Sequence, residues 1–364
     1  MKILFVCPSL AYGGAERVCV SWANGLTRLG HSVDILLPNN APIIYKPSPK
    51  VQIVHLPVLQ SVFLKHIPIV NDIVRLRKLI LKNKYQVIVE VLHYLYFPIR
   101  LATWSIKQKI PIVYTTHEAL ERPLKVPLPL KLRIVQFYAN RLYDYITVLT
   151  NRDKEILNSK KFNNVTVLHN PLFLAPTQPN SAKKQKIILS VGRVDRWYYK
   201  GFDLLIQAWN KVYPKHSDWK LNIVGNASET TLSYLQSLVE NKDSIAFIPF
   251  TENIKKLYEE AAIYCLSSRY EGWGLVLVEA MSQGCAAIAC DFIGRQAEII
   301  DDGKNGLLCT PGSINSLADI LETLLSDEML INKFQEEAPK SLEKFQEDII
   351  ARKLETLLKQ LIRS

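Results

Sequence analysis

The sequence lacks the long apolar run of a membrane-spanning helix. Among its 364 residues, no stretch approaches the ~20 consecutive apolar residues that cross a bilayer. The N-terminal MKILFVCPSL has an apolar run only from Ile3 to Cys7, and Pro8 follows it. A signal peptide needs a longer apolar segment, so this run predicts a first β-strand.

Closely spaced cysteine pairs are also missing. The six cysteines include no CxxC pair and show no spacing typical of a disulfide framework. We interpret them as small apolar residues in a reducing compartment. The sequence therefore predicts a cytoplasmic protein.

Several cofactor and metal motifs are absent. The first turn, PSLAYGGAER, contains no GxGxxG, and no GxxxxGK[ST] phosphate loop occurs. His117-Glu118 is followed by Glu121, where a zinc-binding HExxH motif needs its second histidine. No DxD pair is present that would clamp a divalent metal. These absences argue against dinucleotide, P-loop and metalloprotease chemistry, and we predict no metal site.

What the sequence does contain is a repeated alternation of apolar runs and helical patterns. The runs include KILFVC, VDILL, YQVIVEVL and IPIVYTT, and later IILSVG, WKLNIVG, AIYCLSS and CAAIACD. Apolar strands separated by helices indicate parallel sheets covered on both faces, so we expect two doubly wound, Rossmann-like α/β domains. The proline-containing segment 169–186 is the best candidate for a linker. We assign residues 1–172 and 173–345 to the two domains, and 346–364 to a helix that packs back on the first.

Positive charge is concentrated in the first half of the chain. Residues 1–180 contain 23 Lys and Arg against 9 Asp and Glu, whereas the rest contain 22 against 25. Such a basic half suggests an anionic partner, with nucleic acid, an anionic membrane and a phosphorylated acceptor as candidates. The alternative is a soluble basic surface with no partner.

Two features near predicted strand ends suit an anion. Gly13-Gly14 opens the first predicted helix, where missing Cβ atoms let an anion approach backbone N–H groups; the alternative is a plain tight turn. In VGRVDRWYYKG, Arg193 and Lys200 flank a strand-to-helix loop and suit a diphosphate. The alternative for these side chains is an ordinary cationic surface.

Two further features place polar side chains at strand ends. His117 ends IPIVYTTH, although a lone histidine there is more often structural. In SSRYEGWGLVLVEAMSQG, Glu271 lies in a loop bracketed by glycines, and Glu279 lies inside the short helix predicted to begin near Gly274. Residues eight apart lie about 80° out of register on a continuous helix, so we do not interpret the two carboxylates as an acid/base dyad.

Motifs in a particular order cover nearly the whole chain. They are GGAER, a histidine after the fourth strand, GR…KG opening the second domain, FTENIKKLY, E-x7-E followed by AMSQG, and DGKNGLL. Together they resemble glycosyltransferase family 4, which consists of retaining enzymes with the GT-B fold. The resemblance implies two α/β domains facing across a cleft, with an acceptor-side N-terminal domain and a C-terminal domain that binds a nucleotide sugar.

The resemblance implies a role for each candidate residue. Arg193 and Lys200 would hold the donor's diphosphate, Glu271 would accept hydrogen bonds from sugar hydroxyls, and His117 would face the transferred sugar. Glu279 would bind the ribose hydroxyls. The donor-binding residues implied in this way are Gly13, Gly14, Gly192, Gly274, Leu275 and Glu279. The segment FIGRQA departs from the family pattern at Arg295 and Gln296, which puts the donor contacts of that loop in doubt.

The expected reaction moves a hexose or N-acetylhexosamine from a nucleotide-diphosphate sugar, most commonly a UDP-sugar, to a hydroxyl of a glycan or lipid-linked acceptor. It retains the anomeric configuration and needs no metal and no cofactor. FTENI resembles enzymes of bacterial surface-polysaccharide synthesis. Basic-apolar stretches at 73–84 and 123–133 suggest peripheral contact with an anionic membrane, at the inner face of the cell membrane. The alternative for 73–84 is an ordinary amphipathic helix that covers the sheet.

Three alternatives remain open from the sequence. A nucleotide-sugar epimerase shares the architecture and would act without an acceptor. A non-catalytic subunit that binds a nucleotide sugar is possible, although both glutamates and both cations are present. A nucleic-acid binder would explain the basic half, but no aromatic RNP stretch or Cys/His finger occurs, and we predict no nucleic-acid partner.

Overall fold

The structure, a computed structural model, describes residues 1–56, 69–92, 96–121, 140–177 and 184–363. Its contacts divide the chain into two compact units. Unit 1 comprises Met1–Pro171 and Phe345–Ser364, and unit 2 comprises Leu172–Lys344. Part of the segment 169–186 and the whole basic stretch 123–133 lie outside the described residues.

Unit 1 contains a seven-stranded sheet in the order β3-β2-β1-β4-β5-β6-β7. Every neighbouring pair in it is parallel. The central strands β1, β4 and β5 are almost wholly buried and apolar, which is the pattern of a sheet covered on both faces. The strands are β1 (Lys2–Val6), β2 (Ser32–Pro38), β3 (Gln52–Leu56), β4 (Val87–Val91), β5 (Ile112–Thr115), β6 (Tyr145–Val148) and β7 (Val165–Val167).

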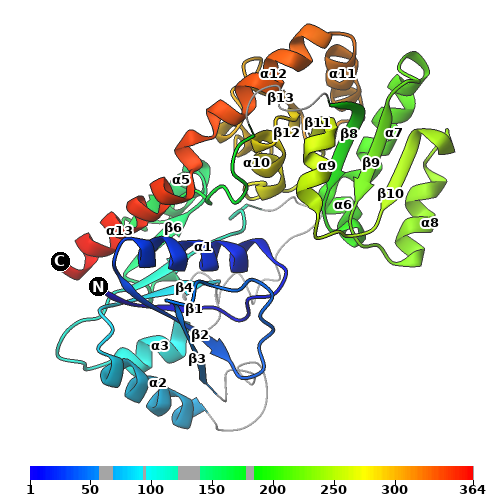
Figure 1. Ribbon diagram of the computed structural model, residues 1–364. Coiled ribbons are helices and arrows are strands. Elements are labelled where there is room, and N and C mark those ends of the chain that lie inside the picture. Colours follow the sequence, from blue (N-terminus) through cyan, green and yellow to red (C-terminus); the bar gives the residue numbers. More distant parts are fainter. Residues whose placement is uncertain (57–68, 93–95, 122–139, 178–183, 364) are drawn as a thin grey trace. The chain divides into compact units, whose positions relative to one another are not determined.

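The described helices of unit 1 cover both faces of this sheet. Residues of α2 and α3 pack into one apolar cluster with Leu4, Val6 and Ile88, whereas α1 and α13 lie on the opposite side (Figure 1). These helices are α1 (Gly14–Arg28), α2 (Ile69–Asn83), α3 (Tyr96–Thr103), α5 (Asn151–Ser159) and α13 (Glu347–Arg363).

The C-terminal helix α13 packs against α1 within unit 1. A Cβ added at Gly25 of α1 would lie 2.6 Å from the Cβ of Ala351, so a glycine allows the two helices to approach closely. Arg28 forms ion pairs with Glu347 at 2.6 Å and Asp348 at 2.9 Å. The last residues of the chain thus complete the first unit.

Unit 2 contains a six-stranded sheet in the order β10-β9-β8-β11-β12-β13, again with every neighbouring pair parallel. Two parallel α/β units confirm the predicted fold class. The strands are β8 (Gln185–Val191), β9 (Lys220–Val224), β10 (Ile245–Ile248), β11 (Ala261–Leu266), β12 (Ala286–Cys290) and β13 (Gly306–Cys309). The helices are α6 (Trp197–Lys200), α7 (Phe202–Val212), α8 (Glu229–Ser237), α9 (Ile254–Glu260), α10 (Leu275–Ser282), α11 (Ile314–Leu325) and α12 (Glu328–Ser341).

Each sheet has one point at which the strand order reverses. It lies between β1 and β4 in unit 1 and between β8 and β11 in unit 2. In open parallel sheets, ligands bind beside the carboxyl ends of the strands at this point. The segments that follow β1, β8 and β11 contain Gly13-Gly14, Arg193 and Glu271. The topology therefore brings predicted residues to the expected edge of each sheet.

Candidate functional site

The segment after β8 presents two cations. Arg193 is exposed and precedes a short 3₁₀ turn (Val194–Arg196), and Lys200 is the last residue of α6. A Cβ added at Gly192 would lie 3.5 Å from the Cδ and Cε atoms of Lys200. The lysine side chain therefore packs against the end of β8 at Gly192, and the nearest atom to such a Cβ is Cζ of Phe202 at 3.3 Å.

The segment after β11 brings the carboxylate of Glu271 to Lys200. The Nζ atom of Lys200 lies 2.7 Å from Oε2 of Glu271, and the two side chains are 25% and 16% exposed. A partly buried ion pair is stronger than an exposed one because water screens it less. The structure thus joins two residues for which the sequence implied separate roles.

A bidentate ion pair fixes the geometry of this cation–carboxylate pair. Arg269 donates to both oxygens of Asp203, at 2.6 and 2.7 Å, and to the carbonyl of Tyr198 at 2.8 Å. The backbone N–H of Arg269 donates to the carbonyl of Tyr199 at 2.9 Å. These bonds tie the loop containing Glu271 to the helical turn containing Lys200.

Position 201 requires a glycine because the same two loops approach each other closely there. Its φ is +67°, and a Cβ there would lie 1.9 Å from the carbonyl oxygen of Ser267. The hydroxyl of Ser267 donates to the carbonyl of Lys200 at 2.9 Å. The two loops therefore contact one another through backbone atoms that any side chain at position 201 would push apart.

Helix α10 begins directly after the loop that contains Glu271. Gly274, with φ of +99°, is its N-cap and makes no side-chain capping bond, and Leu275 is the first helical residue. Free N–H groups and the helix dipole make such a terminus suitable for an anion. Glu279, one turn further on, is 5% exposed, and the hydroxyl of Tyr258 donates to it at 3.3 Å.

Hydrogen bonds within unit 2 fix the loop that follows β12. Asp291 accepts backbone bonds from Gly294, Gln296 and Ala297 at 3.1, 2.9 and 3.2 Å. Gln296 is fully buried; it accepts from the N–H of Phe292 at 2.7 Å and donates to the carbonyl of Trp273 at 3.3 Å. The side chain of Arg295 is also fully buried. The two residues that depart from the family pattern therefore support the loop from within unit 2.

In unit 1, the glycine pair lies where the sequence predicted a helix start. Gly13 is the N-cap of α1 and Gly14 its first residue. A Cβ at Gly13 would lie only 2.1 Å from a carboxylate oxygen of Glu16, so this side chain folds over the glycine. An acidic group in the first turn is favourable beside the helix dipole, and here it occupies the place at which an anion would approach.

His117 follows β5, which is the fifth strand of unit 1 in chain order and not the fourth, and its side chain is half-buried. Its Nε2 lies 3.2 Å from the hydroxyl of Thr115, and its ring centroid lies 5.6 Å from that of Trp22. Burial lowers the pKa of His117 to about 4, although the neighbouring Asn170 amide favours the charged form. In the described part of the chain, Nδ1 of His117, Nε1 of Trp22 and Oδ1 of Asn170 make no hydrogen bond of good geometry. A neutral histidine therefore lies among buried polar atoms that a hydroxylated ligand could satisfy.

Comparison with known proteins adds a second line of evidence. "Glycosyl transferases group 1" matches residues 175–341, and "Glycosyltransferase Family 4" matches residues 12–175. An uncharacterized glycosyltransferase of Haemophilus influenzae is 28% identical over 86% of this chain and 87% of its own length. The GalNAc-α-(1→4)-GalNAc-α-(1→3)-diNAcBac-PP-undecaprenol α-1,4-N-acetyl-D-galactosaminyltransferase of Campylobacter jejuni is 26% identical over 90% of both chains.

Solved structures show the same fold over the full length. A glycosyltransferase from Rickettsia africae superposes with a TM-score of 0.80 at 20% identity and covers 100% of this chain and 99% of its own. An Anabaena protein solved with UDP and glucose gives a TM-score of 0.78 at 20% identity and covers 99% of both chains. The chain is a GT-B glycosyltransferase. No helix among the described residues of this glycosyltransferase has the length and apolar content that a membrane span needs.

Sequence reasoning missed two residues that shape the site of the glycosyltransferase. Arg269 and Asp203 carry no motif of their own, and their pairing joins segments 66 positions apart. The signal that was available is that Asp203 and Arg269 each lie within three residues of a predicted site residue, Lys200 and Glu271. Oppositely charged neighbours of two residues expected to meet are themselves candidates for an ion pair.

Proposed function

We propose that the protein transfers a hexose or N-acetylhexosamine from a UDP-sugar to a hydroxyl of a glycan or lipid-linked acceptor, with retained anomeric configuration and no metal. The observation that carries the proposal is the placement of Lys200 and Glu271, 2.7 Å apart, beside the uncapped start of α10. Lys200 and the start of α10 both follow strands of the unit 2 sheet, and the Glu271 carboxylate contacts the lysine.

Charge on the departing diphosphate is the main chemical demand of this reaction. As the glycosidic bond breaks, negative charge grows on the phosphate oxygens that leave with the nucleotide. Arg193, Lys200 and the amides at Gly274 and Leu275 would stabilise that charge from fixed positions, without reorganisation during the reaction. Backbone N–H groups at Gly13 and Gly14 would add further donors once the Glu16 side chain moves off Gly13, whereas the N–H of Gly192 already donates to the carbonyl of Val224 at 3.0 Å.

The carboxylates and the histidine would recognise neutral parts of the substrates. Glu271 would accept hydrogen bonds from sugar hydroxyls while keeping Lys200 in place, and Glu279 would accept from the ribose hydroxyls. His117, neutral because its pKa is lowered to about 4, would exchange hydrogen bonds with the transferred sugar. No protein side chain is assigned as the base; a leaving phosphate oxygen would take the proton of the acceptor hydroxyl on the same face.

The known relatives support the choice of substrates. The Campylobacter relative is named for transfer of N-acetyl-D-galactosamine to an undecaprenol-diphosphate glycan, and a Staphylococcus aureus relative for transfer of N-acetylglucosamine to poly(ribitol-phosphate). Solved proteins of the same fold carry UDP, UDP-glucose or UDP with glucose. We therefore place the reaction in the synthesis of a bacterial surface polysaccharide or glycolipid.

A donor screen tests the proposal. The protein is mixed with a panel of nucleotide sugars, and unfolding is followed by thermal shift; a ligand at 100 times its Kd should add about 2.7 kcal/mol of stability. The donor that stabilises the protein is then incubated with and without lipid-linked and soluble glycan acceptors, with EDTA present. We expect UDP release that depends on acceptor and resists EDTA, and a product whose NMR coupling constant shows the retained anomer. Conversion of the donor without acceptor would identify an epimerase, and failure of UDP and every nucleotide sugar to stabilise the protein would reject the donor site.

A further inference from the structure

Helix α2 of unit 1 has a solvent face on which apolar and cationic side chains alternate. Val74 and Leu81 are 43% and 49% exposed, which is high for aliphatic side chains on a helix that covers a sheet. Arg75, Lys78 and Lys82, which are three and four residues apart, are exposed as well, and Lys78 lies four residues after Val74 and three before Leu81. The inner side of the helix, with Leu76 and Ile80, is buried in the core of unit 1.

A fixed tryptophan extends this surface beyond the helix. Trp104 follows the end of α3 and is 69% exposed. Nη1 of Arg77, on α2, donates to the carbonyls of Ala102 and Trp104 at 3.0 and 2.6 Å, so the tryptophan is attached to the helix. Amphipathic rings of this kind are typical of membrane–water interfaces.

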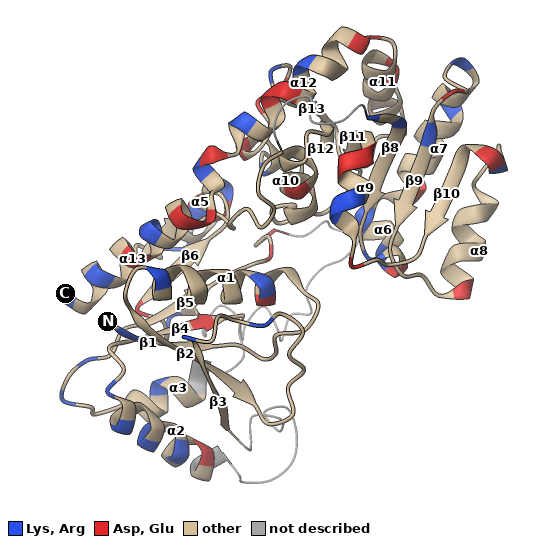
Figure 2. Ribbon diagram, viewed as in Figure 1, with Lys and Arg blue, Asp and Glu red and all other residues tan. Residues whose placement is uncertain are grey.

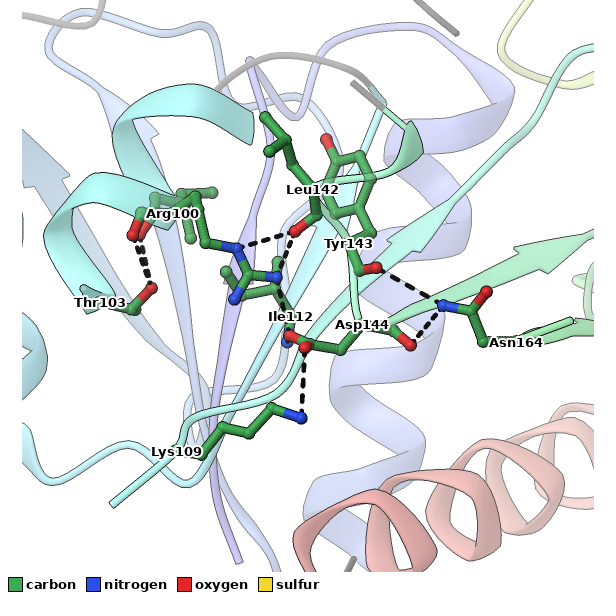
Figure 3. Close-up of polar contacts among 9 residues, drawn as sticks. Arg100, Thr103, Lys109, Ile112, Leu142, Tyr143, Asp144 and Asn164 are labelled. Carbon is green, nitrogen blue, oxygen red and sulfur yellow. Dashed lines mark hydrogen bonds and ion pairs between the residues drawn. The ribbon is translucent and has the colours of Figure 1, made fainter. Parts of the chain in front are cut away.

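An ion-pair network holds the other end of the tryptophan-containing segment. Figure 3 shows Arg100 donating to the carbonyl of Leu142 and to the carboxylate of Asp144, the latter at 2.9 Å. The N–H of Ile112 donates to the same carboxylate at 2.9 Å, and Nζ of Lys109 lies 3.5 Å from it. Asp144 is thus paired with Arg100 and with Lys109, and these three side chains together keep a net charge of +1.

The charge of this surface has one sign. In the ranges 71–92 and 98–110, none of the exposed residues is acidic, and the single acidic residue of α2, Asp72, is half-buried. Figure 2 shows the predominance of basic residues on α2. We call this surface the α2 face; it consists of Val74, Arg75, Lys78, Leu81, Lys82, Lys84, Trp104, Lys107 and Lys109.

We propose that the α2 face docks on an anionic lipid bilayer. Its six cations match the negative surface potential of acidic lipids, to which each nearby Lys or Arg adds roughly five-fold in binding. Its three apolar side chains lie among the cations, where they can enter the headgroup region and gain from burial. A nucleic acid would use the cations but leave Val74 and Leu81 without a partner, so the mixed composition favours the bilayer.

The direction of α2 gives this docking a consequence for the enzyme. Since α2 leads directly into β4, it ends beside the amino ends of the parallel strands and begins toward their carboxyl ends. A bilayer along the α2 face would therefore reach the carboxyl edge of the unit 1 sheet, the edge at which Gly13 and His117 lie. An acceptor anchored in the same bilayer would have its glycan close to this edge.

Vesicle co-sedimentation tests the proposal without any activity measurement, so its result is independent of the transfer reaction. Purified protein is mixed with phosphatidylcholine vesicles with or without phosphatidylglycerol, at low and at physiological ionic strength. We expect binding only when phosphatidylglycerol is present, with weakening as salt is added. Absence of the protein from the phosphatidylglycerol pellet at low salt would overturn the proposal, as would binding to a DNA duplex but not to vesicles.

Variants locate the contact. Lys78→Glu/Lys82→Glu should lower the vesicle partition coefficient roughly 25-fold or more, because two cations are lost and two repulsive charges added. The matched control is Arg352→Glu/Lys353→Glu, which changes two exposed cations of α13 in the same unit and should retain most of the binding. Equal loss in both pairs would mean that only total charge matters, and would overturn the assignment to the α2 face.

A fluorescence measurement provides a readout that charge alone does not produce. Lipids with brominated acyl chains quench tryptophans that enter the bilayer, so wild-type fluorescence should fall on binding. In Trp104→Phe that quenching should disappear, and in Trp104→Ser the partition coefficient should fall about ten-fold. Quenching that persists in Trp104→Phe would show that another surface enters the membrane. Circular dichroism confirms that each variant is folded.

Discussion

The two units of this glycosyltransferase present their candidate residues in opposite electrostatic settings. In unit 2, Lys200 and Glu271 form a partly exposed ion pair that is positioned by the Arg269–Asp203 pair. In unit 1, His117 is half-buried, and its lowered pKa keeps it neutral at physiological pH. The basic side chains described on unit 1 include those of the α2 face, which lie on the outside of a covering helix.

This contrast shows that the net charge of a unit does not predict the charge of the residues at its sheet edge. The first half of the chain is strongly basic, yet the sheet edge of unit 1 contains a neutral imidazole, two glycines and the Glu16 carboxylate. Most of unit 2 lies within the weakly acidic part of the chain, yet the unit places two cations at its sheet edge. A diphosphate needs fixed opposite charge, whereas sugar hydroxyls need neutral donors and acceptors. The following four predictions test this contrast, from the largest effect to the smallest.

Removal of the lysine in unit 2 should have the largest effect. We expect Lys200→Ala to lower kcat/KM roughly a thousand-fold, because one fixed charge on the developing diphosphate is lost. Steady-state kinetics with the donor identified above measures this. Lys186→Ala serves as control, since Lys186 is the second residue of β8, in the same unit, but pairs with Asp218 at 2.5 Å on the surface. Near-normal kcat/KM in Lys200→Ala would exclude this lysine from the site.

Breaking the ion pair that positions the site should destabilise unit 2. Arg269→Met leaves the Asp203 carboxylate, 9% exposed, without its bidentate partner. We expect a loss of about 3 kcal/mol in the free energy of unfolding, together with loss of activity. Urea denaturation measures the first and the donor assay the second. Arg196→Met, at an exposed arginine of the same segment, should change stability by less than about 0.5 kcal/mol.

The neutral histidine of unit 1 should give the protein a pH-dependent stability. The folded-state pKa of about 4 lies below the ordinary value of 6.5, so the unfolded state binds more protons between these values. The contribution of His117 to stability is therefore complete above about pH 6.5 and is lost as the pH falls toward 4, by at most about 1.4 kcal/mol per pH unit.

Denaturation curves across this pH range test the histidine prediction. In His117→Gln the free energy of unfolding should depend less steeply on pH, because the unfolded state no longer binds the one extra proton that it takes up at His117. His55→Gln removes an exposed histidine of the same unit and should leave the pH dependence that comes from His117 unchanged. An unchanged slope in His117→Gln would mean that the imidazole is already charged in the folded state.

A strained residue in unit 2 should give the smallest effect. Ile293, in the loop after β12, is 47% exposed and has φ of +56°, a conformation that costs a branched residue roughly 1–2 kcal/mol. Ile293→Gly should therefore raise the free energy of unfolding by about 1 kcal/mol. Ile293→Val keeps the branched side chain and the strain, and should leave stability nearly unchanged. Destabilisation by glycine would show that the isoleucine side chain makes contacts that outweigh its strain.

Much of the fold could be predicted because apolar strands and helical stripes are local properties. Runs such as IILSVG and CAAIACD are buried strands in the structure. The placement of Gly13, Arg193, His117 and Glu271 after strands also followed from the local pattern. Their contacts did not follow from it. Neither the closure of Glu16 over Gly13 nor the ion pair of Lys200 with Glu271 has a signal in the motifs.

The FIGRQA segment shows why the remaining contacts could not be predicted. From the sequence, Arg295 and Gln296 put the donor contacts of this loop in doubt. In the structure both side chains are fully buried in unit 2, and Gln296 bonds to Phe292 and Trp273. Whether a polar side chain faces solvent or the interior depends on which distant groups can satisfy its hydrogen bonds, and a short motif contains no such information.

The sequence by itself determined the two parallel sheets, because long apolar strands separated by amphipathic helices can only be covered on both faces. It also determined which polar residues lie at the carboxyl ends of strands, because these residues directly follow the apolar runs in the sequence. Only the tertiary structure decided that Arg269 and Asp203 hold Lys200 against Glu271, and that Val74, Leu81 and Trp104 share one cationic surface. Those arrangements depend on side chains far apart in the chain that meet only after the sheets have formed.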